Sequence, residues 1–429
     1  MQPSQLQFLV DLVRIGTAVA VFFVVLPRLF LSKVLSKRSV DSLELTWLGV
    51  TCSGTVYVLL VHALVLAGAF DPVSLLVCVL ALAGIGLLLT YRQVGPSRSY
   101  ADLLRHLEKG DWGYGLRGGV RSRMLITGGV GSAAGILGGL VLAVAAVRVR
   151  PFLMSPNAYS FTFYETLHGV KALQLGELYP GGVLQERGMH AFGLAVHVLS
   201  QVHEDTVVRL LGLVSALLLA YTIYAVTRSM TDRSWAGVVS AALFGVAGVS
   251  QLPLGATLHV SADPSVLATV FLLPAIYFAG RYVERGRRNL LVVASGALIA
   301  CAAIDISVAA FGGALLMVQA VSGWMVSSTR RRSLRAGHVL AVNAALFLAI
   351  VHGVWSASYL VQPVDPQAVP YFQVVAETAR SVASMPPVNS KLVLGALGAV
   401  ALLGLIGTID TDPDRATAAR TLAIGGGAT

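Results

Sequence analysis

Long apolar runs recur along the whole chain, and they constrain its fold more than any other feature of the sequence. A helix of about twenty apolar residues crosses the hydrocarbon core of a bilayer, where the backbone must satisfy its own hydrogen bonds. Only 12% of the 429 residues are charged, whereas ordinary soluble domains have about 25%. The sequence therefore predicts an all-α polytopic membrane protein and excludes a conventional soluble enzyme.

About eleven of these runs are long enough to be predicted as transmembrane helices. They cover residues 7–32, 43–69, 72–91, 124–147, 205–228, 235–253, 264–281, 289–304, 307–327, 337–360 and 391–408. Basic residues gather in short clusters between the runs, which is the pattern of cytoplasmic loops. Lys33, Lys37 and Arg38 follow the first run, so we expect the N-terminus outside and the C-terminus in the cytoplasm.

The same basic clusters account for the net charge of +10. Because they alternate with apolar runs, they indicate orientation in a membrane and contact with membrane lipids, and we expect no nucleic-acid partner. A composition rich in Ala, Val, Leu and Gly and poor in Lys suits a prokaryote, which predicts the plasma membrane as the location. All three cysteines lie in apolar runs without a C-x-x-C pair, so we expect neither disulfides nor a zinc site.

The chain divides into three predicted parts. Residues 1–120 form an N-terminal three-span bundle with a basic cytoplasmic segment, which is a candidate surface for a protein partner. Residues 121–408 form the main multi-span module, with long external loops at 148–204 and 361–390. Residues 409–429 are polar and Gly-rich at the end, which predicts a mobile tail.

The external loop 148–204 contains no predicted span. Its run 188–203 is short for a span, and polar residues beginning with His190 recur there on one helical face. We therefore expect an amphipathic helix lying in the membrane interface, preceded by a second helix over 158–175. Loops of this length are usually functional or disordered, and this one is too apolar to be disordered.

Acidic side chains collect on the predicted external face. They are Glu165, Glu177, Glu186, Asp263, Asp305 and Asp365. Such a group can supply a general base, or hold a divalent cation against a phosphate. Structural roles are equally open, because Asp263 before Pro264 is typical of a helix N-cap, Asp305 can cap the next helix, and Glu165 fits a solvated helix face.

The order of these parts follows a known pattern. The span 124–147 leads into the loop SPNAYSFTFYETLHGVKALQLGELYPGG, and GMHAFGLAVHVLSQVHEDTVVRLLGLVSALLLAYTIYAVTRSM follows with further spans and short basic turns. This arrangement over about 124–330 resembles the polyprenyl-phosphate-dependent membrane glycosyltransferases of the GT-C superfamily. In that family a first core span is followed by a long external loop with two interfacial helices.

The resemblance implies transfer of a sugar from a polyprenyl-phosphate donor on the external face, with inversion at the sugar carbon. The family places an aspartate early in the first loop, where this chain has Asn157, and an amide cannot act as a general base. Glu165, Asp263 and Asp305 are then the candidate catalytic residues. The expected substrate-binding residues are Asn157, Tyr159, Arg187, His190 and Arg209, and Mg²⁺ or Mn²⁺ is a possible cofactor.

Two other functions remain open. A non-catalytic membrane subunit that keeps the fold and binds a partner would explain why asparagine stands at position 157. A lipid or polymer transporter with the external loop as a lid would require a polar path through the spans, and the sequence shows no obvious one.

Overall fold

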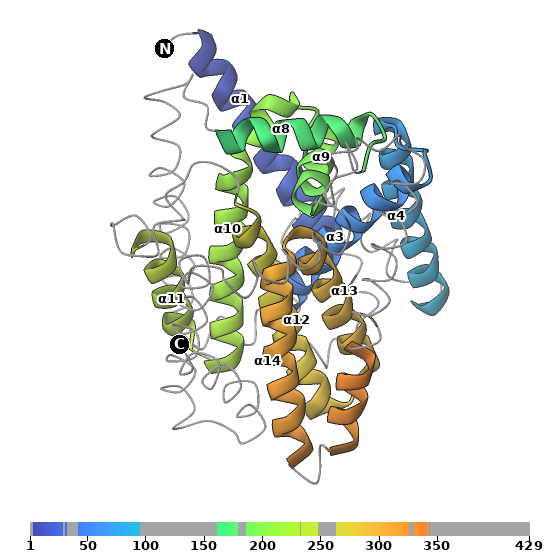
Figure 1. Ribbon diagram of the computed structural model, residues 1–429, viewed down its shortest axis with the longest axis vertical. Coiled ribbons are helices and arrows are strands. Elements are labelled where there is room, and N and C mark those ends of the chain that lie inside the picture. Colours follow the sequence, from blue (N-terminus) through green and yellow to red (C-terminus); the bar gives the residue numbers. More distant parts are fainter. Residues whose placement is uncertain are drawn as a thin grey trace, which may run out of the picture.

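The computed structural model describes residues 3–28, 31, 42–94, 161–178, 186–231, 233–247, 263–325, 330–340 and 343. This part of the chain is helical and contains no strand (Figure 1). Four helices are long and apolar enough to cross a membrane, namely Leu6–Arg28, Glu44–Leu66, Glu204–Thr231 and Pro264–Arg285. They support the prediction of an integral membrane protein with an all-α fold.

The helical elements follow the predicted apolar runs closely. They are α1 (Pro3–Ala18), η1 (Val19–Val25), α3 (Ser42–Leu66), α4 (Pro72–Val94), α8 (Phe161–Gln174), α9 (Gly188–Ser200), α10 (Glu204–Thr231), α11 (Ser234–Ala247), α12 (Pro264–Arg285), α13 (Arg288–Ile304) and α14 (Ile306–Met325). The predicted span 124–147, nearly all of 337–360, the span 391–408, the loop 361–390 and the tail 409–429 lie outside the described residues. The total of about eleven spans and the orientation of the termini therefore stay predictions.

Short turns make α12, α13 and α14 alternate in direction. Gly286 ends α12 in the left-handed conformation, with φ of 73°, a geometry that glycine adopts without strain. A single residue, Asp305, then separates α13 from α14. The start of α12, the end of α13 and the start of α14 consequently lie at one end of the bundle. In Figure 1, α8 lies across the corresponding end of α10, with which it is in contact.

The first helix contains a π-helical stretch, η1, which is held by α3. The wider turn of a π-helix changes the partners of the backbone carbonyls, and in a bilayer those carbonyls need partners within the protein. The hydroxyl of Ser53 donates to the carbonyl of Phe23 at 3.3 Å, and the hydroxyl of Tyr57 donates to the carbonyl of Phe22 at 3.1 Å. The ring of Phe23 packs against Tyr57 and Phe192, with centroids 4.9 and 5.3 Å apart.

Helix α3 lies within the larger bundle. It packs against α9, α10, α12 and α13, which belong to the predicted module 121–408. Among the described residues, α3 therefore joins the predicted N-terminal bundle to that module, and the boundary near residue 120 stays a prediction.

A buried ion pair connects the start of α3 to the end of α12. The Arg281 guanidinium lies 3.2 Å from Oε1 of Glu44 and 3.6 Å from Oε2 of Glu284. The Tyr277 hydroxyl donates to the same Glu44 oxygen. The side chains of Glu44 and Arg281 are each only 10% exposed, so their charges are compensated mainly by each other and by these neighbours.

We expect Glu44→Gln to destabilise the fold by about 3 kcal/mol, because it leaves the buried Arg281 with less compensating charge. Glu165→Gln is the matched control, since Glu165 is exposed on α8, and we expect a change within about 0.5 kcal/mol. Denaturant-induced unfolding of the full chain in mild detergent measures both values. Equal stability of the two variants would contradict the structural role of the ion pair.

Candidate functional site

Two aspartates start neighbouring helices at one end of the bundle. Asp263 caps α12: its Oδ1 accepts a hydrogen bond from the backbone N–H of Ser265 at 2.9 Å and one from the Ser265 hydroxyl at 2.7 Å. Asp305 caps α14 in the same way, accepting from the backbone N–H groups of Ser307 at 2.8 Å and Val308 at 3.1 Å. The capping role that the sequence allowed for both residues is confirmed, and it fixes both carboxylates at the helix ends.

The start of α9 reaches the same place because of Gly188. A Cβ atom at this position would lie 2.6 Å from the carbonyl carbon and oxygen of Ala303, the penultimate residue of α13. Only glycine permits this approach without moving the backbone. The contact brings Glu186, just before α9, to the start of α14, where its carboxylate accepts a hydrogen bond from the backbone N–H of Ile306.

Asp305 lies within electrostatic reach of both Glu186 and Asp263. Glu186 keeps an exposed surface, but the protein atoms that surround it raise its pKa by desolvation, and the charge of Asp305 raises it further. Burial also raises the pKa of Asp305 above its usual range, and the nearby charge of Asp263 acts in the same direction, against the hydrogen bonds from Ser307 and Val308. A raised pKa increases the proton affinity of a carboxylate, and a general base has to accept a proton from its substrate.

Arg187 directly follows Glu186 in the chain, and His190 lies near the Glu186 backbone; Arg187 and His190 are both 5% exposed. Helix α8 passes over them at Gly169, where a Cβ would overlap the His190 ring and come within 2.7 Å of the Arg187 guanidinium. Burial lowers the pKa of His190 to about 3, and the charge of Arg187 contributes to the same effect. The ring is therefore neutral at pH 7, while Arg187 remains a cation.

We call Glu186, Arg187, His190, Asp263 and Asp305 the acid–arginine cluster. It combines a buried guanidinium, which suits bidentate binding of a phosphate or a carboxylate, with carboxylates that can accept a proton. His62 on α3 and His168 on α8 also lie within electrostatic reach of His190. The cluster thus draws its residues from segments that are far apart in the sequence.

The structure brings some of the predicted site residues together and leaves others apart. Asp263, Asp305, Arg187 and His190 belong to the cluster. Glu165 is exposed on α8, and Arg209 is half-buried in the second turn of α10.

Two of the predicted substrate-binding residues, Asn157 and Tyr159, lie outside the described residues. Sequence analysis placed Glu186 among the external carboxylates but gave it no role in the site. No signal in the sequence near Glu186 indicates its place, because the packing of Gly188 against the end of α13 joins segments that are far apart in the chain.

The expectation that residues 188–203 form a helix lying in the membrane interface is not met. All residues of α9 except His197 are buried within the protein, and α1, α3, α8, α10 and α13 pack around it. Among the polar residues of α9, His197 hydrogen-bonds within the protein, from Nδ1 to the carbonyl of Val202 at 2.6 Å. Helix α8, by contrast, is amphipathic, with Tyr164, Glu165, His168 and Lys171 exposed.

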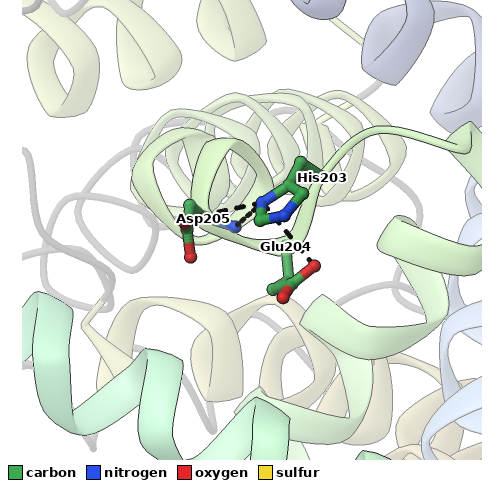
Figure 2. A group of neighbouring side chains, drawn as sticks. All are labelled: His203, Glu204 and Asp205. Atoms are coloured by element: carbon green, nitrogen blue, oxygen red, sulfur yellow. Dashed lines mark hydrogen bonds and ion pairs between the residues drawn. The ribbon is translucent and has the colours of Figure 1, made fainter.

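A second polar group lies at the start of α10, where His203, Glu204 and Asp205 are consecutive (Figure 2). Their ligand atoms lie within 4.8 Å of one another, and Nδ1 of His203 is 3.6 Å from a carboxylate oxygen of each acid. That nitrogen also accepts the backbone N–H of Asp205 at 3.4 Å, and Glu204 lies 3.9 Å from Nζ of Lys171. These contacts are those of a capped first helical turn, and we assign no cation to the group.

Comparison with protein families, with curated proteins and with solved structures finds no significant match. The chemistry of the acid–arginine cluster is therefore the basis for a functional interpretation.

The buried neutral His190 predicts an acid-sensitive fold. The pKa of His190 is lowered in the folded protein, so below the ordinary histidine pKa of about 6.5 the unfolded chain binds a proton that the folded chain does not. The free energy of unfolding is therefore highest above pH 6.5 and declines as the pH falls towards the pKa of the folded protein. We expect His190 to lower the free energy of unfolding by about 2 kcal/mol between pH 7.5 and pH 5. His190→Gln should lack that part of the pH dependence, as measured by unfolding in detergent at both pH values. Identical pH dependence in both proteins would contradict the assignment.

Proposed function

We propose that the protein is a GT-C-type membrane glycosyltransferase, which moves a sugar from a polyprenyl-phosphate donor to an acceptor at the acid–arginine cluster. The observation that carries the proposal is the buried Arg187, which follows Glu186 in the chain, together with the raised pKa values of Glu186 and Asp305. This combination supplies the two functions that such a transfer requires, namely a cation for the phosphate and a base for the acceptor.

Arg187 is the proposed ligand of the donor phosphate. It precedes the first turn of α9, which has no side-chain cap, and the N-terminus of a helix favours an anion through its N–H groups and its dipole. A guanidinium binds phosphate oxygens in a bidentate manner. The neutral His190 beside it can donate a further hydrogen bond without adding charge.

Asp305 is the proposed general base, with Asp263 and Glu186 adjusting its proton affinity. In the proposed step the carboxylate takes the proton from the acceptor hydroxyl as the acceptor oxygen forms a bond to the anomeric carbon. The bond from that carbon to the phosphate oxygen breaks, and the electron pair leaves with the polyprenyl phosphate, which Arg187 stabilises. Attack from the opposite face inverts the configuration of the sugar carbon.

The setting of the reaction follows from the predicted topology. The cluster faces the outside of a prokaryotic plasma membrane, the N-terminus is outside and the C-terminus is cytoplasmic. The polyprenyl chain lies among membrane lipids, with its phosphate at the cluster. The carboxylates of Glu186, Asp263 and Asp305 would hold Mg²⁺ or Mn²⁺, and the ion would supply positive charge to stabilise the phosphate. The N-terminal segment 1–120 is the proposed surface for a protein partner.

A non-catalytic subunit that binds the lipid phosphate without transferring sugar is the second candidate. The observation in its favour is that Asp263 and Asp305 both cap helices, a structural role that needs no reaction. Asparagine at position 157 agrees with this alternative.

Substitution of the aspartates by asparagine separates the two candidates, because asparagine caps a helix as well as aspartate but cannot act as a base. We expect Asp305→Asn to lower sugar transfer at least about a hundredfold while the protein still folds. The matched control is Asp71→Asn, since Asp71 also precedes a proline and also accepts a helix N–H, that of Val73 at 3.1 Å. Transfer from labelled polyprenyl-phosphate mannose, glucose and galactose is measured in membranes containing each protein.

The proposal fails if the triple replacement of Glu165, Asp263 and Asp305 leaves transfer intact. If the wild-type protein binds polyprenyl phosphate and transfers none of these sugars, the non-catalytic subunit is favoured. Loss of transfer in Asp71→Asn as large as in Asp305→Asn would mean that stability, and not a base, is being measured.

A further inference from the structure

A small cavity lies at the other end of α12 from the acid–arginine cluster. Residues lining it include Glu44, Tyr277, Arg281, Arg285, Arg287 and Asn289. They come from the start of α3, the last turns of α12 and the turn into α13. Because α12 has 22 residues, the cavity and the cluster are separated by roughly 33 Å along the helix, so the two sites are distinct.

The cavity carries an excess of positive charge. Its lining contains three arginines and one glutamate, Glu44. Arg281 is held by Glu44 at 3.2 Å and by Glu284 at 3.6 Å, so the arginines exceed these two glutamates by one charge. Arg285 is attracted by Glu44 and repelled by Arg281 and Arg287, and an anion bound by Arg285 and Arg287 would reduce that repulsion.

The position of the cavity matches the level of lipid headgroups. Helices α3 and α12 are both long and apolar enough to cross a membrane, and the cavity lies where α3 begins and α12 ends. Aromatic rings gather beside it, as is common at membrane interfaces: the ring of Trp47 lies 5.0 Å from that of Tyr277 and 5.1 Å from that of Phe278, measured between centroids.

We propose that Arg285 and Arg287, which are exposed where they line this cavity, bind the phosphate of an anionic phospholipid headgroup at its opening. Guanidinium groups bind phosphate oxygens in a bidentate manner, and basic pockets between transmembrane helices are suited to acidic headgroups. Glu44 holds Arg281 in place at the buried side of the cavity, while Arg285 and Arg287 are exposed and can reach a lipid. The proposal does not rest on the proposed sugar transfer.

The test compares lipid binding by the full chain in mild detergent. Phosphatidylglycerol, phosphatidylcholine and inorganic phosphate are titrated separately, and bound species are counted by native mass spectrometry. The site variant is Arg285→Gln with Arg287→Gln. The matched control is Arg288→Gln with Arg331→Gln, which removes the same charge from two exposed arginines outside the cavity lining.

We expect one phosphatidylglycerol to bind in preference to phosphatidylcholine. The site variant should weaken that binding about thirtyfold, since each arginine contributes about a factor of five to the binding of an acidic lipid. The control should weaken it less than about threefold, because charges outside the site are screened by salt. The single variant Arg287→Gln, measured in the same way, should show an intermediate effect and covers the case in which the double variant folds poorly.

Three outcomes would overturn the proposal. Equal weakening by the site variant and the control would mean that the arginines attract acidic lipid only through their overall charge, without a specific site. Equal binding of both phospholipids would exclude recognition of an acidic headgroup. Full competition of phosphatidylglycerol by millimolar inorganic phosphate would assign the cavity to a free anion and exclude the lipid as its source.

Discussion

Inside a bilayer no water is available to buried polar groups, so each of them must find its partner within the protein. Among the described residues the structure meets this requirement at several places, although some buried side-chain atoms, including the hydroxyls of Thr222 and Ser240, have no hydrogen-bond partner. The hydroxyls of Ser53 and Tyr57 donate hydrogen bonds to carbonyls of the π-helical stretch. Glu44 and Arg281 neutralise each other between α3 and α12, and the carboxylates of Asp263 and Asp305 cap the helices that follow them. Close helix packing at small residues such as Gly188 makes these partnerships possible.

The same requirement gathers the ionisable residues of the candidate site. Asp263 and Asp305 lie at one end of the bundle because α12 and α14 begin there and need caps. Once the start of α9 packs against the end of α13, Glu186 and Arg187 join them. Stability and chemistry are thus linked in the cluster: a carboxylate placed to cap a helix becomes a candidate base when burial and neighbouring charge raise its pKa.

Sequence patterns predicted those parts of the structure that depend on local information. The apolar runs located α10, α12, α13 and α14 to within a few residues, and Asp263 followed by Pro264 indicated a helix start. The burial of α9 was not predictable from its own sequence, because the helices that cover it include α3 and α13, which are distant along the chain. The place of Glu186 depends on the same long-range contact, whereas Glu165 was given weight from a helical face that turned out to be exposed.

The most direct test of the account is mass spectrometry of the lipids that copurify with the full chain in mild detergent, for the wild-type protein and for Arg187→Gln and Asp305→Asn. The account predicts polyprenyl phosphate, bare or carrying a sugar, on the wild-type protein and on Asp305→Asn, and its loss from Arg187→Gln. Bulk phospholipid alone on the wild-type protein, or polyprenyl phosphate retained equally by Arg187→Gln, would contradict it.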